Sequence, residues 1–423
     1  MQPVRKRYII LDALRGFALL GICLANFPEF SLYSFLSAQD AAALQTPELD
    51  RALRWLLAFF VDGKFYTVFS LLFGIGFSII LEHASGEGGR GLKVFYRRML
   101  CLLAIGLVHL WLLWSGDILT LYALLGMLLP LWRRCSDRGL LRWAGFFLLL
   151  PVAVDAVVEL GRLRPAGWFH DRQWAVCARY GITEANFACW LRDCDSYRGV
   201  LQFLHQGGFE RMTEFIDGNR YFKVLGLFLL GYYAGRRRFY ARLGELRPLL
   251  RRIVRTGFAL GLPLSALYAW SSVHGRPWGL TAHTALYTGS VFPMGLAYAA
   301  GLCLLYLRSE DGGIWRALAA PGRMALSNYL FQTLCGMVIF YGGIGFGLGA
   351  GLSISFVLPI AAGVWLLGMA LSAAWLRHFR FGPVEWLWRM LTYGQRLPLR
   401  KSESPKQKEL TKRCKLFGRR STL

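Results

Sequence analysis

Apolar stretches of about 20 residues recur along almost the whole chain, and each is long enough to cross a lipid bilayer as a helix. A helix pairs every backbone polar group within its own segment, which a membrane interior requires. Of the 423 residues, 55% are hydrophobic and only 17% are charged. The sequence therefore predicts an all-α fold, a polytopic integral membrane helix bundle.

We expect about ten transmembrane helices. They lie at residues 9–27, 60–82, 97–114, 117–132, 141–159, 220–236, 253–272, 283–307, 323–342 and 353–376. The connections between them alternate between basic and weakly charged. The basic set comprises residues 5–7, 90–98, 133–142, 236–255, 308–323 and the tail from Arg377. Because short basic loops stay on the cytoplasmic side, this alternation predicts that both termini are cytoplasmic.

The formal net charge of +24 has two explanations, a nucleic-acid partner or a membrane topology signal. Most Lys and Arg residues fall in short clusters beside apolar spans. That distribution favours the positive-inside rule over a nucleic-acid surface. We therefore expect membrane lipids as partners and no nucleic acid.

The chain is expected to form one membrane domain over residues 1–395, followed by a basic, disordered cytoplasmic tail over 396–423. The outer loop 160–219 is long enough to form a small cap of short helices. Its three cysteines, Cys177, Cys189 and Cys194, would allow one disulfide in an oxidising compartment, although the sequence does not select the pair. The sequence has no zinc-type Cys or His spacing, so no metal site is predicted.

The first span carries polar residues at a depth where charge is expensive and usually functional. Arg15 and Asn26 are eleven residues apart, which places them about 20° from one helical face and about 16 Å apart along the axis. Asp12 and Arg15 have i, i+3 spacing and face the same way. They are either a snorkelling arginine paired with an aspartate, or an anion site for the phosphates of a donor.

A second polar group surrounds the turn at Ser115-Gly116. If the hairpin is antiparallel about this turn, His109 lies beside Tyr122 rather than Asp117. A buried histidine next to a tyrosine hydroxyl can serve as a general base. The alternative is a hydrogen-bonded core histidine. Asp117 either caps the following helix or contributes to a binding site.

Lys64 is expected near the outer mouth of the second span, where it either snorkels or binds substrate. Ser327, Asn328 and Gln332 form a polar stripe in RMALSNYLFQTL. Interhelical hydrogen bonding explains this stripe, and the lining of a polar cavity is the alternative.

Five stretches, in order along the chain, resemble the YeiB-like membrane proteins of bacteria. They are LDALRGFALLGICLANF, GKFYTVFSLLFGIGF, GLVHLWLLWSGDILTLYALLG, GRMALSNYLFQT and FRFGPVEWLWRMLTYG. The family is similar to membrane acyltransferases, both the type-3 enzymes and the heparan N-acetyltransferase. The resemblance implies a protein of the inner membrane that moves an acyl group from cytoplasmic acyl-CoA to an acceptor on the outer face. Acyl-CoA would be a co-substrate, and no permanently bound cofactor is implied.

The resemblance fails at one position. Type-3 enzymes carry an arginine, ten residues and then a histidine in the first helix, whereas this chain has Arg15 and Asn26. Asparagine has no basic nitrogen and cannot be a general base. We therefore assign Arg15 to the donor, Asn26 to orienting a carbonyl or acceptor, and His109 to proton abstraction. The alternative function is transport of a small anionic or amphipathic solute. The oligomeric state is left open.

Overall fold

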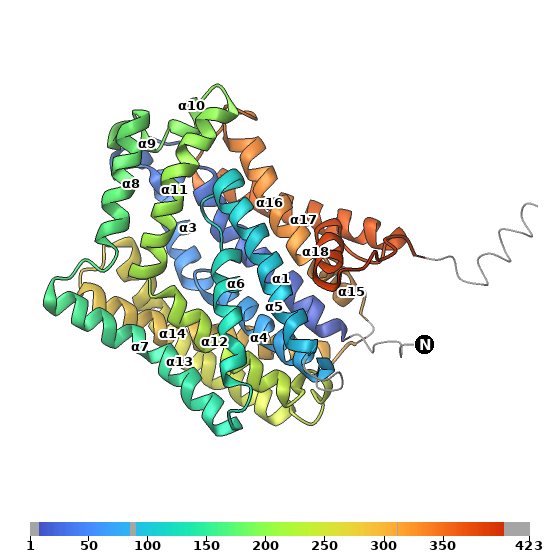
Figure 1. Ribbon diagram of the computed structural model, residues 1–423. Coiled ribbons are helices and arrows are strands. Elements are labelled where there is room, and N and C mark those ends of the chain that lie inside the picture. Colours follow the sequence, from blue (N-terminus) through green and yellow to red (C-terminus); the bar gives the residue numbers. More distant parts are fainter. Residues whose placement is uncertain (1–7, 85–89, 311, 402–423) are drawn as a thin grey trace, which may run out of the picture.

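Helix α1 (Ile9–Phe30) lies inside the bundle and packs against α4, α14, α15, α16 and α17 (Figure 1). The computed structural model describes residues 8–84, 90–310 and 312–401. Each of the ten apolar stretches predicted from the sequence is helical. Other long helices that fall on predicted spans are α4 (Lys64–Ala84), α5 (Arg90–Val108), α7 (Asp137–Gly161), α13 (Arg247–Val273), α14 (Gly279–Tyr306) and α17 (Ile354–His378).

In the described part of the chain, six helical stretches are long and apolar enough to cross a membrane. They are Ile9–Phe30, Pro47–Glu82, Gly91–Leu113, Asp137–Gly161, Gly279–Tyr306 and Ile354–His378. The other predicted spans are shorter or more polar: α6 (Leu119–Leu128), α12 (Arg220–Arg236), α13 and α16 (Ala325–Phe340). The apolar helices together indicate a multi-pass membrane protein.

Helix α3 (Pro47–Phe60) precedes α4 and packs against α13. The turn between α3 and α4 contains Gly63, whose φ of +75° is a conformation that favours glycine. Trp55 and Phe59 of α3 surround Tyr268 of α13. The amphipathic segment before the second span therefore folds back onto the bundle.

The loop 160–219 forms helices as predicted, at the top and left of Figure 1. They are α8 (Gly167–Tyr180), α9 (Glu184–Phe187), α10 (Trp190–Asp193) and α11 (Tyr197–Asp217). Helix α11 has 21 residues and packs against α12 and the end of α5, so this region reaches into the bundle. Cys177, Cys189 and Cys194 are all free thiols, and the disulfide considered for them is not formed.

Helix α15 (Gly313–Arg323) contacts α1 backbone to backbone. A Cβ atom added at Gly16 would come 1.9 Å from the Leu318 carbonyl oxygen, and one at Gly322 would come 1.8 Å from that of Asp12. Only glycine fits at either position. This close approach brings the end of α15 beside the polar first turns of α1.

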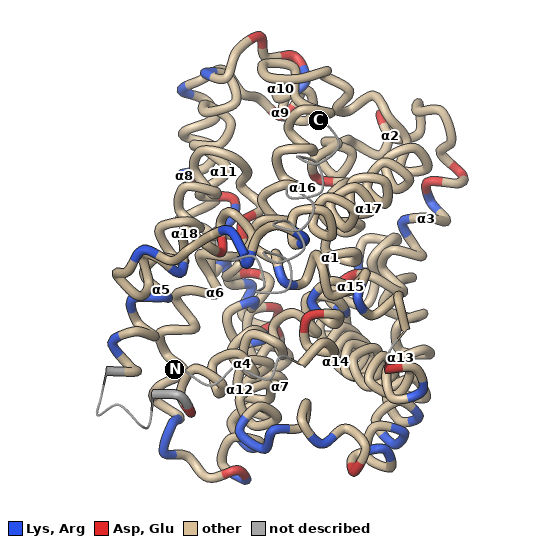
Figure 2. Tube along the Cα trace, turned by 90° about the vertical axis from the view of Figure 1, so that its right-hand side faces the viewer, with Lys and Arg blue, Asp and Glu red and all other residues tan. Residues whose placement is uncertain are grey.

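Helix α18 (Pro383–Tyr393) packs against α5 and α16. Residues 396–401, which the sequence analysis assigned to the tail, pair with the chain after α17, where the Arg380 amide donates to the Leu399 carbonyl at 2.9 Å. The rest of the predicted tail, 402–423, lies outside the described residues. Figure 2 shows basic residues around one end of the bundle, near the labels α5, α12 and α13.

Candidate functional site

A cavity of about 980 Å³ follows one face of α1 through the bundle. Six of the α1 residues that line it recur at alternating spacings of three and four. This stripe comprises Asp12, Arg15, Leu19, Ile22, Asn26 and Glu29. At 1.5 Å per residue it is about 26 Å long, close to the thickness of a bilayer core. The predicted common face of Arg15 and Asn26 is thus part of a longer cavity wall.

One end of the cavity, here called the Arg15 pole, is lined by basic side chains and two carboxylates. It comprises Asp12, Arg15, Arg98, Arg323, Glu385 and Arg389. Arg15 and Asp12 form the predicted ion pair at 3.0 Å. The Arg98 guanidinium stacks on Trp388, 3.8 Å from the ring centre. Four cations against two acidic groups favour an anionic ligand at this pole.

Glu385 joins α18 to the start of α16. Its Oε1 accepts the amides of Leu326 and Ser327 at 2.7 and 3.1 Å, and Oε2 accepts the Ser327 hydroxyl at 2.5 Å. Burial raises the pKa of this carboxyl, an effect that the hydrogen bonds oppose. Glu385 therefore holds one wall of the Arg15 pole in place.

The middle of the cavity is mainly apolar, with Leu19 and Ile22 on α1 facing Phe69 and Phe73 on α4. Asn26 lies just beyond this region, and its amide makes no hydrogen bond with any described residue. An apolar passage between two polar ends suits an amphipathic or acylated ligand.

The opposite end, here called the Glu29 pole, mixes acidic, basic and aromatic side chains. It comprises Glu29, Asp62, Arg211, Arg220, Lys223, Arg276, His283 and Tyr287. The carboxyl of Glu29 lies within the electrostatic influence of Arg211, Arg220 and Asp62. Two ion pairs support this end, since Glu214 on α11 contacts Arg211 and lies 3.7 Å from Arg220.

Two carboxyls on α11 titrate differently because of their surroundings. Burial, followed by the nearby charges of Glu214 and Glu29, raises the pKa of Glu210 to about 8. Burial also acts to raise the pKa of Glu214, but Arg211 and Arg220 outweigh it and lower that pKa.

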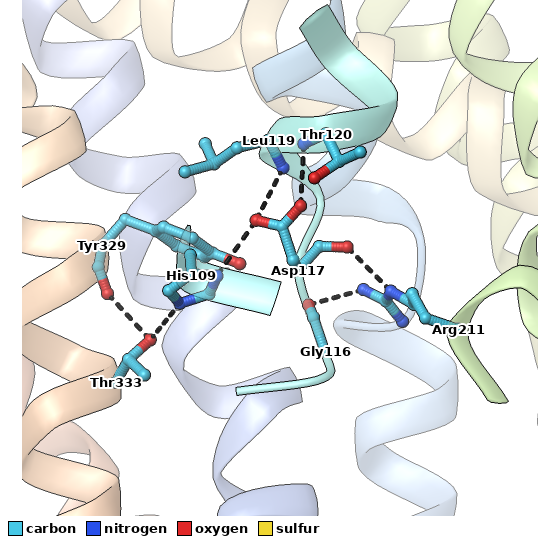
Figure 3. A network of polar contacts seen from close by, with 8 residues as sticks. All are labelled: His109, Gly116, Asp117, Leu119, Thr120, Arg211, Tyr329 and Thr333. Carbon is cyan, nitrogen blue, oxygen red and sulfur yellow. Dashed lines mark hydrogen bonds and ion pairs between the residues drawn. The ribbon is translucent and has the colours of Figure 1, made fainter. Parts of the chain in front are cut away.

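His109 belongs to a π-helical turn (His109–Leu113) at the end of α5 and is fully buried. Figure 3 shows its two partners. Nδ1 donates to Asp117 Oδ1 at 3.0 Å, and Nε2 lies 2.9 Å from the Thr333 hydroxyl of α16. The predicted pairing with Tyr122 is wrong, because the Tyr122 hydroxyl contacts Ser70 at 2.5 Å instead.

Asp117 fixes the start of α6. Its carboxylate accepts the amides of Leu119 and Thr120 at 3.1 and 2.7 Å, which supports the capping interpretation. Arg211 donates from Nε to the Asp117 carbonyl at 2.7 Å and also contacts the Gly116 carbonyl at 2.5 Å (Figure 3). Because both ring nitrogens of His109 are engaged, this network favours a structural role for His109.

The other predicted binding residues lie outside the cavity lining. Lys64 is buried rather than snorkelling, and its Nζ donates to the Ala58 carbonyl at 2.7 Å. Asn328 donates to Ser372 of α17 at 2.8 Å, as interhelical hydrogen bonding predicts. Gln332 Nε2 donates to the Leu19 carbonyl at 3.5 Å, and its Oε1 has no partner among the described residues.

Curated relatives align with this chain over nearly its whole length. It is 31% identical to uncharacterized protein YxaH of Bacillus subtilis, covering 95% of this chain and 98% of that protein. It is 30% identical to uncharacterized protein YeiB of Escherichia coli, with 92% and 96% covered. The family model "Protein of unknown function (DUF418)" matches residues 234–395. The chain belongs to the DUF418 family. No solved structure matches it.

The residues matched by the DUF418 model include His283, the one histidine that lines the cavity among the described residues. Its Nδ1 lies 3.0 Å from the Ser271 hydroxyl, and its ring packs 5.0 Å from that of Tyr268. His283 was not predicted as a site residue, because it is the first residue of a predicted span, where a polar side chain usually faces water. Glu29 was not predicted either, although Glu29 continues the Arg15–Asn26 stripe three residues on.

Among the residues that the structure describes, no group of three or more His, Cys, Asp or Glu side chains could hold a metal ion.

Proposed function

We propose that this DUF418 protein is a membrane acyltransferase that takes an acyl group from acyl-CoA and passes it to an acceptor on the other side of the membrane. The observation that carries the proposal is the single cavity, which joins a basic pole to a histidine-containing pole through an apolar middle. The basic pole suits the phosphates of the donor, the apolar middle suits its acyl-bearing end, and the histidine-containing pole suits the acceptor.

The Arg15 pole would bind the phosphates of acyl-CoA. The guanidinium of Arg15 has five N–H donors in a fixed fork that matches phosphate geometry. Arg15 donates to Asp12 at 3.0 Å and lines the cavity together with Arg323. The apolar middle would then receive the uncharged acyl-bearing end of the donor.

The Glu29 pole would bind the acceptor, and His283 would act as general base. Nδ1 lies 3.0 Å from the Ser271 hydroxyl, and in the tautomer that donates Nδ1–H to this hydroxyl, Nε2 keeps its lone pair. Nε2 would take the proton of an acceptor hydroxyl or amine as that atom attacks the thioester carbonyl. The carbon–sulfur bond breaks, and the leaving thiolate of coenzyme A takes the proton back from His283. The part assigned to His109 from the sequence passes to His283 in this proposal.

The orientation follows from the basic connections. We propose ten spans in the bacterial inner membrane with both termini cytoplasmic, so that the Arg15 pole opens toward the cytoplasmic acyl-CoA pool. The Glu29 pole and α8–α11 would then face the periplasm.

Binding of acyl-CoA to the purified full-length protein tests the donor site. Replacing Arg15 with alanine removes charge-assisted contacts worth about 1.5–3 kcal/mol, so Kd should rise about 10- to 100-fold. Arg15→Lys keeps the charge but loses the forked guanidinium, so its Kd should lie between the values for wild type and Arg15→Ala. Arg142→Ala is the matched control, because Arg142 is exposed on α7 and outside the cavity. Equal affinity in all four proteins contradicts the donor site.

Transport is the second candidate, because the cavity has charged groups at both poles and so offers one route between them. His283→Gln separates the two functions. In the acyltransferase, this variant should bind acyl-CoA normally and lose transfer by about 100-fold or more. Solute uptake into proteoliposomes that is unaffected by His283→Gln, together with no acyl transfer by the wild type, would favour the transporter.

A further inference from the structure

Lys223 of α12 is a buried cation that forms no ion pair with any residue the structure describes. Only 8% of its surface is exposed, and it lines the cavity at the Glu29 pole. Its Nζ lies 4.2 Å above the ring of Tyr287, and no carboxylate among the described residues lies within 4 Å of it. Burying an ammonium without a counter-charge is costly, so such a group normally meets a ligand or a carboxylate.

Two carboxylates of α7 accept hydrogen bonds from residues that line this end of the cavity. Asp155 of α7 accepts Asn219 Nδ2 at 2.6 Å on one oxygen and the Thr284 hydroxyl at 2.5 Å on the other. Glu159 accepts the amides of Leu280 and Thr281 at the start of α14. Neither carboxylate forms a close ion pair with Lys223, although the charge of Asp155 acts on it.

A second cation lines the same end of the cavity as Lys223. Arg276 follows α13, lines the cavity and forms no ion pair with a described residue. Lys223, Arg276 and His283 all line the cavity, and the charges of both cations act on the ring of His283. The rings of Tyr268 and Tyr287 form an aromatic wall beside them.

We infer that Lys223 and Arg276 form a binding site for the phosphate group of a phosphate ester, whose remaining part lies against the two tyrosine rings. The identification of this ester as the acyl acceptor rests on the proposed function, whereas the anion site rests on the geometry alone. A phosphate held there would place the neighbouring hydroxyl groups of the same molecule near His283. The ester is either a water-soluble compound or a phospholipid headgroup, which share this chemistry.

Binding to the purified full-length protein tests the site. The soluble probe is glycerol phosphate, measured by calorimetry in an uncharged detergent. The lipid probe is phosphatidylglycerol in mixed micelles, compared with phosphatidylcholine. At least one anionic probe should bind, and the one that binds identifies the source. Lys223→Gln and Arg276→Gln should each weaken that binding at least 10-fold, while Lys223→Arg should largely retain it.

Arg276→Gln keeps the test valid if Lys223→Gln fails to fold, because Arg276 is exposed. Arg142→Ala is the matched control, because Arg142 is exposed and lies outside the cavity, and it should leave phosphate-ester binding unchanged. Absence of binding by both probes, or equal binding by wild type, Lys223→Gln and Arg276→Gln, overturns the inference. Acyl-CoA binding measured on the same variants keeps the outcomes separate: if it persists while the phosphate-ester site fails, the donor half of the proposed function stands.

Discussion

Replacing His109 with glutamine distinguishes a structural histidine from a catalytic one. In the structure Nδ1 donates to Asp117 and Nε2 contacts Thr333, and the ring is fully buried. Glutamine has one terminal amide group, which cannot reach in both directions as the imidazole ring does. One of the two buried partners therefore loses its hydrogen bond.

The size of the effect follows from these contacts. A hydrogen bond to a charged group such as the Asp117 carboxylate contributes about 1.5–3 kcal/mol, and a neutral one such as that to Thr333 contributes about 0.5–1.5 kcal/mol. The free energy of unfolding should therefore fall by about 2 kcal/mol, because one bond is kept in a changed form. Asp117 keeps its amide donors at the start of α6, so the fold itself should survive.

The assay measures thermal unfolding and turnover on the same purified variant. His109→Gln should lower Tm by a few degrees and leave acyl transfer per folded molecule within about twofold of wild type. His170→Gln is the control, since His170 is exposed on α8. A loss of transfer of about 100-fold, the scale of a missing general base, with an unchanged Tm would refute the structural role and restore the catalytic assignment of His109.

Three further outcomes are expected. Arg211→Gln removes buried bonds to the carbonyls of Gly116 and Asp117 and should lower the free energy of unfolding by about 3 kcal/mol, measured by chemical unfolding. The pKa of Glu210 is raised from its ordinary value of 4.5 to about 8 in the folded protein. Between these two pH values the folded state keeps a proton that the unfolded state has lost. The free energy of unfolding therefore falls as the pH rises through this range. Glu210→Gln should remove this fall in Tm between pH 5 and 8, and an identical pH dependence in both proteins would contradict it. Cysteines introduced at 343–350 should react with an impermeant thiol reagent added from the periplasmic side, and cysteines introduced at 395–401 should not react. The reverse labelling pattern would contradict the proposed topology.

The sequence alone could predict the features that depend on neighbouring residues. Hydropathy over about 20 residues predicted ten helical stretches of the bundle, because helix formation in lipid is a local requirement. The i, i+3 pair of Asp12 and Arg15 and the common face of Arg15 and Asn26 followed from helical periodicity. The capping interpretation of Asp117 likewise depended only on the residues that follow it.

The position of His109 required the tertiary structure. The sequence pattern predicts two regular helices around Ser115-Gly116. The chain instead forms a π turn before the break, and α6 begins only at Leu119. This change of register lets Asp117 reach Nδ1 and leaves Tyr122 deeper in the bundle. The second partner, Thr333, is 224 residues away in the sequence, so no local pattern could identify it.

The composition of the cavity was decided in the same way. Asn328 and Gln332 have the polarity and spacing of lining residues, yet the packing of α16 directs them to neighbouring helices. Lys223 and His283 lie at the starts of their helices, where a polar residue usually faces water, but in this protein they line the cavity. The sequence by itself determined which segments are helices and which α1 residues share a face. Only the packing of those helices decided which polar groups meet, because these contacts join segments that are far apart along the chain.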